Sequence, residues 1–83
     1  MTNVEIMKQL VEIFKSENML ENKKAYKDFK NNEDLDSLNV SSQKIVSLIG
    51  KLVNLGIVEK TPNGKTTLYQ LTTNYTDLLE LIK

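Results

Sequence analysis

Between residues 42 and 65 the chain carries side chains whose types and spacing suit contact with nucleic acid. An amide such as that of Gln43 pairs with the edge of adenine, a hydroxyl such as that of Ser47 donates to a base or a phosphate, and lysines neutralise phosphates. The candidate contact residues are Ser42, Gln43, Lys44, Val46, Ser47, Lys51, Lys60, Asn63 and Lys65. Residues 37–72 hold four lysines against Glu59, a net charge of +3 in a chain whose net charge is zero. The alternative interpretation is an ordinary solvated helix face.

The composition argues against catalysis. The chain has no histidine, cysteine or tryptophan, and all eleven of its basic residues are lysine. It therefore lacks the commonest general base, the usual zinc ligands and the planar guanidinium that binds guanine or phosphate bidentately. Glu33, Asp34 and Asp36 form an acidic cluster, but such a cluster in a polar segment is usually solvated, and the glycine and distal glutamate of an EF-hand are missing. We expect no enzyme activity, no cofactor and no bound metal.

The length and the apolar pattern predict a single small domain inside the cell. A chain of 83 residues buries only about 60–65% of its unfolded surface, so further burial against a second copy would add stability. The start of the chain lacks the basic and apolar segments of a signal peptide. No apolar run approaches the roughly 20 residues that a membrane span needs. We expect a cytoplasmic protein that does not enter membranes.

An amphipathic helix is expected to present the candidate contact residues. Its apolar side chains recur at helical spacing and comprise Ile45, Leu48, Ile49, Leu52 and Leu55. Ser41 or Ser42 is the expected N-cap, and Gly56 suits the positive φ that often follows a helix end. Gly50, in the middle of the helix, costs about 1 kcal/mol relative to alanine, which suggests a compensating role such as close approach to a neighbouring helix.

A β-hairpin is expected directly after this helix. The first strand begins at Ile57 and Val58, the turn spans Thr61–Lys65, and the return strand spans Thr66–Thr72. Asn-Gly between two apolar runs is the strongest short-range hairpin signal, and Asn63-Gly64 supplies it.

The run LVNLGIVEK, followed by PNGK and TLYQLT, resembles the recognition helix and wing of winged helix-turn-helix regulators. The arsenic-repressor-like and multiple-antibiotic-resistance-regulator-like families are the nearest comparisons, over about 33 of the 83 residues. The resemblance implies a mainly α fold with a small β-hairpin, in the order helix–helix–helix–wing–helix, and a single winged-helix domain over 1–83. It also implies a recognition helix in the major groove, a wing on the DNA backbone and a homodimer formed through terminal helices.

The N-terminal half is expected to supply two further helices. Thr2 and Glu5 fit a capping box that starts a helix over Asn3–Glu17, whose apolar stripe packs in the core. Asn22 is a candidate cap for a short second helix that turns three residues inward, namely Ala25, Tyr26 and Phe29. The segment 31–39 departs from the winged-helix pattern and is either a loop or one extra helical turn anchored by Leu35 and Leu38.

The last residues, 73–83, predict a short helix that begins after Asn74 as N-cap. Its wide apolar stripe consists of Tyr75, Leu78, Leu79, Leu81 and Ile82. Ten residues are too few for an isolated helix to be stable, so this helix must pack on the first helix of its own chain, on a second copy, or on both. These five residues are the candidate dimerisation residues.

Two functions are consistent with these sequence features. The first is a small homodimeric transcription regulator that binds double-stranded DNA. The second is a winged-helix module for protein–protein interaction, an assembly subunit or an inhibitor, which the neutral net charge, the missing arginine and the acidic segment 33–36 favour. A positive surface that runs from Lys44 and Lys51 to the hairpin lysines favours DNA. An apolar patch around Val46 and Gly50, or acids beside that helix, favours a protein partner.

Overall fold

The computed structural model describes residues 1–83, and about half of them are helical. In chain order the elements are α1 (Asn3–Ser16), β1 (Lys24–Ala25), α2 (Tyr26–Phe29), α3 (Glu33–Ser37), α4 (Ser42–Asn54), β2 (Val58–Asn63), β3 (Thr66–Leu71), α5 (Tyr75–Leu78) and a 3₁₀ helix, η1 (Leu79–Leu81). The strands form one small antiparallel sheet. The prediction of a mainly helical chain with a β-hairpin is therefore confirmed. None of the helices combines the length and the apolar character that a membrane crossing requires.

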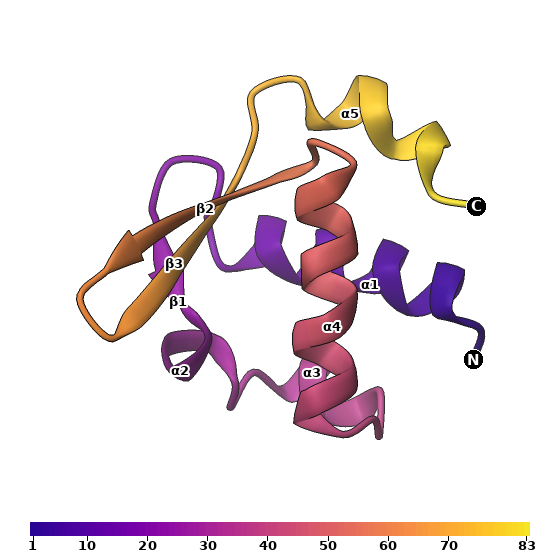
Figure 1. Cartoon of the computed structure of the whole chain (residues 1–83). Helices are drawn as coiled ribbons and strands as arrows, with labels where there is room; N and C mark the ends of the chain where they lie inside the picture. The colour runs from indigo at the N-terminus through magenta and orange to yellow at the C-terminus, as the bar shows by residue number, and fades with distance from the viewer.

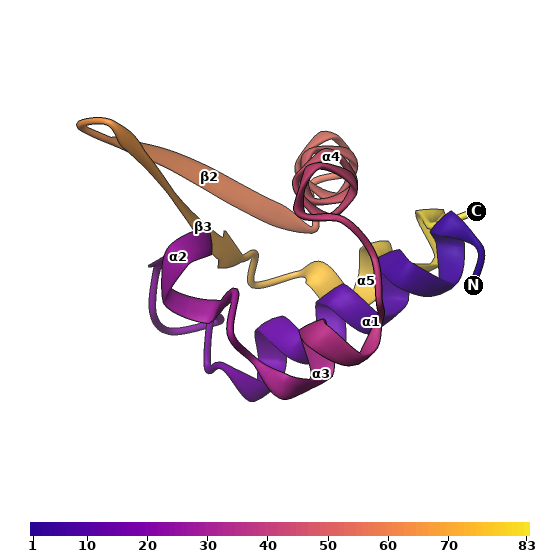
Figure 2. The same ribbon diagram turned by 90° about the horizontal axis from the view of Figure 1, so that it is seen from below.

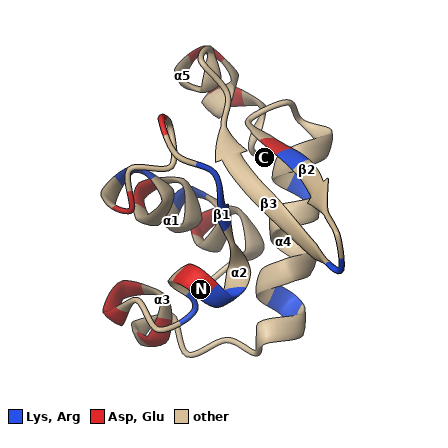
Figure 3. Ribbon diagram, turned by 90° about the vertical axis from the view of Figure 1, so that its left-hand side faces the viewer, with Lys and Arg blue, Asp and Glu red and all other residues tan.

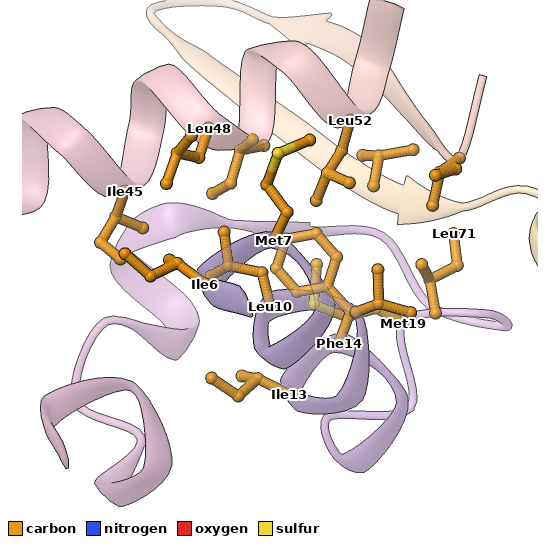
Figure 4. Packing of buried hydrophobic residues seen from close by; sticks show 14 of the residues in the cluster. Ile6, Met7, Leu10, Ile13, Phe14, Met19, Ile45, Leu48, Leu52 and Leu71 are labelled. Carbon is orange, nitrogen blue, oxygen red and sulfur yellow. The ribbon is translucent and has the colours of Figure 1, made fainter. Parts of the chain in front are cut away.

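The hydrophobic core lies where α4 crosses α1, and the base of the hairpin closes one end of it (Figure 1). Leu10 and Phe14 of α1 face Leu52 of α4 in this core, with Leu71 of β3 beside them (Figure 4). The first three of these side chains are completely buried. Phe14 also packs edge-on against Phe29, with ring centroids 5.2 Å apart, which attaches α2 to the core.

Both long helices begin and end as their local chemistry dictates. The capping box of α1 is confirmed, because Thr2 and Glu5 each bond the other's backbone N–H. Gly56 after α4 has the expected positive φ of 83°, and Asn18 after α1 adopts the same conformation at 58°, which was not predicted. The next residue in each case, Met19 or Ile57, donates its N–H to the carbonyl five positions earlier at 3.0 Å. Both of these residues are then completely buried, so each helix end directs the chain back into the core.

The sheet has the strand order β1–β3–β2. The expected turn over Thr61–Lys65 is too long, because β2 continues to Asn63, which pairs with Thr66. Only Gly64 and Lys65 connect the strands, and a positive φ of 65° at the first connecting residue is the geometry that glycine permits in a two-residue hairpin. The third strand, β1, was not predicted, since its two residues pair with the distant Tyr69 and Leu68 of β3.

The segment between α1 and α4 differs from expectation at its start. The prediction of Asn22 as a helix cap is wrong, because the chain first forms β1 and α2 begins only at Tyr26. Ala25 occupies the cap position, and its N–H donates to Asp28 at 3.1 Å. The inward placement of Ala25 and Phe29 is confirmed, whereas Tyr26 is half-buried. Of the two alternatives for 31–39, the extra helical turn is correct: α3 buries Leu35.

The C-terminal segment is less regular than predicted. The α-helix stops at Leu78 after four residues and continues as η1, and Asn74 makes no side-chain hydrogen bond at the cap position. Tyr75 and Ile82 are 9% and 4% exposed, because both pack into the core of their own chain. Packing at its two ends therefore sets the path of this segment, in agreement with the low intrinsic stability of so short a helix.

Candidate nucleic-acid interface

One face of α4 is free of contacts with the rest of the chain. An α-helix advances 100° per residue, which places Gln43, Val46, Ser47 and Gly50 opposite the buried side chains of Ile45, Leu48, Ile49 and Leu52. We call these four exposed residues the α4 strip. All four are exposed, with 41% of Val46 open to solvent. Figures 1 and 2 show that no other element covers this side of the helix.

The N-terminal end of α4 is well defined. Of the two predicted candidates, Ser41 and Ser42, the N-cap is Ser41, and its hydroxyl accepts the backbone N–H of Lys44 at 3.3 Å. Gln43 therefore lies in the first turn, where the helix dipole presents partial positive charge. Its amide makes no hydrogen bond within the chain, so both its donor and its acceptor are free.

Two lysines flank the α4 strip on one side. Lys44 and Lys51 are seven residues apart, so they share one line along the helix, and both are exposed. Lys51 lines a groove together with Val4 and Leu81, which places this line on the side of α4 that faces the two chain termini.

The hairpin flanks the α4 strip on the other side, as Figure 1 shows. Side chains alternate along a strand, so Lys60 projects from the same face of β2 as the core residue Val58. Glu59, the one acid of the hairpin, projects from the opposite face. Lys65 lies at the hairpin tip, and Figure 3 shows positive charge on α4, on β2 and at this tip.

These four flanking lysines have no acidic partner in the chain. The ion pairs are confined to Lys15 with Glu12 and Lys24 with Glu17, on other elements. The acidic helix α3 lies on the far side of the molecule from the exposed face of α4 (Figure 2). Its acids have a local structural role, since Glu33 and Asp34 stand in the first turn, where negative charge stabilises a helix.

All nine predicted contact residues are exposed, and eight of them belong to α4 or β2, with Lys65 in the turn between the strands. One further lysine lies next to the hairpin. Lys27 of α2 and the residues Thr66 and Thr67 of β3 line the same open hollow, which has a volume of about 220 Å³. No sequence pattern indicates this position, because Lys27 stands in a lysine-rich segment typical of a solvated surface. Only the packing of α2 on the sheet brings it next to the hairpin.

The predicted dimerisation residues divide into three groups by exposure. Tyr75 and Ile82 are buried in their own chain, and Leu78 and Leu79 are half-buried. Only Leu81 is exposed, at 46%. It lines an open groove of about 390 Å³ between α1, the C-terminal end of α4 and the C-terminal segment. The apolar residues of this groove are Val4, Met7, Leu55 and Leu81.

The α4 strip and its flanking lysines form the candidate functional site of this structure. Comparison with known proteins finds no matching family model, no matching curated protein and no matching solved structure.

Proposed function

We propose that the chain is a winged helix-turn-helix protein that binds double-stranded DNA as a small transcription regulator. The observation that carries the proposal is the uncharged α4 strip, which lies between two sets of unpaired lysines. A major groove is complementary to this pattern, because its uncharged base edges lie between two negatively charged phosphate backbones.

The assignment of elements follows from their order. In this proposal α1, the α2–α3 pair and α4 are the three helices of the motif, and β2 and β3 are the wing. α4 has thirteen residues and is about 20 Å long, enough to cross a major groove roughly 12 Å wide. Gln43 and Ser47 then face base edges, and Ser42, Lys44 and Lys51 contact phosphates. Lys60, Asn63 and Lys65 contact the adjacent backbone from the wing.

A homodimer completes the proposed binding mode, with two copies reading half-sites about one helical turn apart. The open groove around Leu81 is the surface we assign to the second copy; half of its lining is apolar, and the other half is Asn3, Lys51, Asn54 and Lys83. With roughly six to eight phosphate contacts for the dimer, the affinity for DNA is expected to fall about a thousandfold between about 50 and 200 mM salt.

The test is fluorescence anisotropy of mixed-sequence duplex DNA at these two salt concentrations. The test variant is Lys44→Ala with Lys51→Ala, and the matched control is Lys8→Ala with Lys15→Ala. The control pair removes the same charge at the same seven-residue spacing, but from α1. We expect salt-sensitive binding that the test variant loses and the control retains.

Equal losses in the two variants would place the DNA contact elsewhere and reject the proposed docking. A folded protein that binds no DNA at low salt would favour the second function, a protein–protein interaction module. The observation that favours this alternative is the exposed Val46 in the middle of an uncovered helix face.

A further inference from the structure

The side chains of the α4 strip carry information on the base sequence that such a protein would read. This inference rests on the proposed DNA-binding function and concerns the target of the same site. Among side chains, arginine makes the commonest specific contact with guanine, and the chain contains none. The lysines of α4, which can also reach guanine, lie on the flank of the helix and not on the strip.

Gln43 is the residue of the strip that can form a bidentate contact. Its side-chain amide has no hydrogen-bond partner in the chain, and it stands in the first turn of a capped helix. Recognition helices contact base edges with their N-terminal residues. A glutamine amide matches the N6 donor and the N7 acceptor that adenine presents in the major groove.

Val46 supplies an apolar contact one turn along the same face. A valine in a helix has essentially one side-chain rotamer, so its two methyl groups point outward in a fixed direction. In the major groove the thymine C5-methyl is the apolar group that such a side chain can meet. Gln43 and Val46 are separated by about 4.5 Å along the helix axis, compared with about 3.4 Å between base pairs, so they address base pairs one or two steps apart.

Gly50 continues the strip without a side chain. A Cβ at this position would meet no atom of the chain within 4 Å, so no internal contact explains the glycine. An uncovered glycine on this face lets the helix backbone approach a groove closely at that point.

We infer that the α4 strip recognises A·T base pairs in the major groove, with Gln43 on an adenine and Val46 on the methyl group of a thymine one or two base pairs away. Ser47 is compatible with any base, because a hydroxyl both donates and accepts.

The experiment compares three duplexes of equal length at one low salt concentration, composed of A·T, of G·C and of inosine·cytosine pairs in mixed order. Inosine lacks the N2 amino group of guanine, so its pair with cytosine resembles A·T in the minor groove and G·C in the major groove. We expect the A·T duplex to bind at least about tenfold more tightly than either of the others, within the range of one good base contact. Inosine·cytosine DNA that binds as tightly as A·T would place the reading in the minor groove and reject the inference.

A second comparison isolates the two side chains. Replacement of thymine by uracil removes the methyl group and keeps the base pairing. We expect uracil DNA to bind roughly fivefold or more weakly to the wild-type protein, and this difference to shrink in Val46→Ala, whose shorter side chain makes less contact with the methyl group. Gln43→Ala is expected to weaken binding to A·T DNA more than binding to G·C DNA, and so to lower the preference for A·T.

The outcomes separate the inference from the function on which it rests. Equal binding to the A·T and G·C duplexes, lost in the Lys44→Ala, Lys51→Ala variant, would reject A·T recognition and leave the proposed DNA binding intact. A loss with uracil that is the same in Val46→Ala would assign the effect to DNA shape and not to this side chain. No binding to any duplex would reject both.

Discussion

The side-chain amide of Asn32 donates a hydrogen bond of 2.5 Å to the carboxylate of Glu17, which joins the end of α1 to the residue that caps α3. The other oxygen of this carboxylate accepts from Lys24 of β1 at 3.0 Å. The oxygen of Asn32 in turn accepts the backbone N–H of Asp34 at 2.8 Å. One half-buried carboxylate, with 22% of its side chain exposed, therefore holds β1 and α3 against α1. Because α3 leads directly into α4, this network helps to fix where the proposed recognition helix begins.

Removal of the Asn32 side chain is expected to destabilise the fold. Asn32→Ala loses both the cap of α3 and the donor to Glu17, at a cost of about 1–2 kcal/mol in the free energy of unfolding. Asn32→Asp keeps the cap but sets a carboxylate against that of Glu17, so we expect it to be destabilising near neutral pH as well. Urea unfolding measures both. Wild-type stability in Asn32→Ala would show that the hydrogen bonds of Asn32 contribute nothing to stability.

The stability that Glu17 contributes is expected to depend on pH. The hydrogen bond from Asn32, followed by that from Lys24, holds the pKa of the Glu17 carboxylate below its usual value of 4.5. A depressed pKa means that the folded state favours the ionised form, so the contribution is complete above the unfolded value and is lost as pH falls through the folded one. The difference in unfolding free energy between wild type and Glu17→Gln should therefore shrink below about pH 4.5.

The control for this titration is Glu21→Gln, which changes an exposed acid that makes no side-chain hydrogen bond or ion pair. Its difference from wild type is expected to stay small across the same pH range. A pH-independent effect of Glu17→Gln would contradict the assignment of the network to the ionised carboxylate.

The two glycines of the α4 region are expected to respond to alanine in opposite directions. Gly56 has a φ of 83°, and a Cβ there would also lie 3.4 Å from Leu78, so Gly56→Ala should lower the free energy of unfolding by about 1–2 kcal/mol. Gly50 lies inside the helix with open space around it, so Gly50→Ala should raise it by about 0.5–1 kcal/mol. Urea unfolding of the two variants distinguishes these effects, and a destabilising Gly50→Ala would reveal an internal role for this glycine.

A bulky residue at Gly50 tests the proposed interface without a cost in folding. Gly50→Leu introduces a good helix former into open space, so the thermal stability should be unchanged or higher. If α4 lies in a groove, the same side chain obstructs the approach, and DNA affinity is expected to fall about tenfold, the equivalent of about 1.4 kcal/mol. Gln9→Leu, on the exposed side of α1, is the matched control. Unchanged DNA affinity in Gly50→Leu would place this part of α4 outside the contact.

A charge at Leu81 tests the proposed dimer surface. Leu81 is 46% exposed, so Leu81→Asp should leave the monomer folded while it replaces the exposed apolar side chain beside Val4 and Leu55 by a carboxylate. We expect light scattering with size-exclusion chromatography to give a dimer for the wild type and a monomer for this variant. A dimer that survives the change would move the contact to another surface.

Much of this structure follows from interactions between residues that are close in sequence. The capping box at Thr2, the N-cap at Ser41, the positive φ at Gly56 and the hairpin around Gly64 each depend on a few neighbouring residues, so the sequence alone determined them. The same holds for the exposed face of α4, because helical periodicity separates it from the buried one.

Only the tertiary structure decided the features that depend on distant partners. β1 exists because Lys24 pairs with Tyr69 across the sheet, and no local pattern in two residues can signal such a pairing. Tyr75 and Ile82 have the spacing of an interface stripe, yet the core of their own chain buries them. Lys27 reaches the hairpin through the packing of α2. The chemistry of a side chain sets its preference for burial or for solvent. The residues that it contacts are decided only when the whole chain folds.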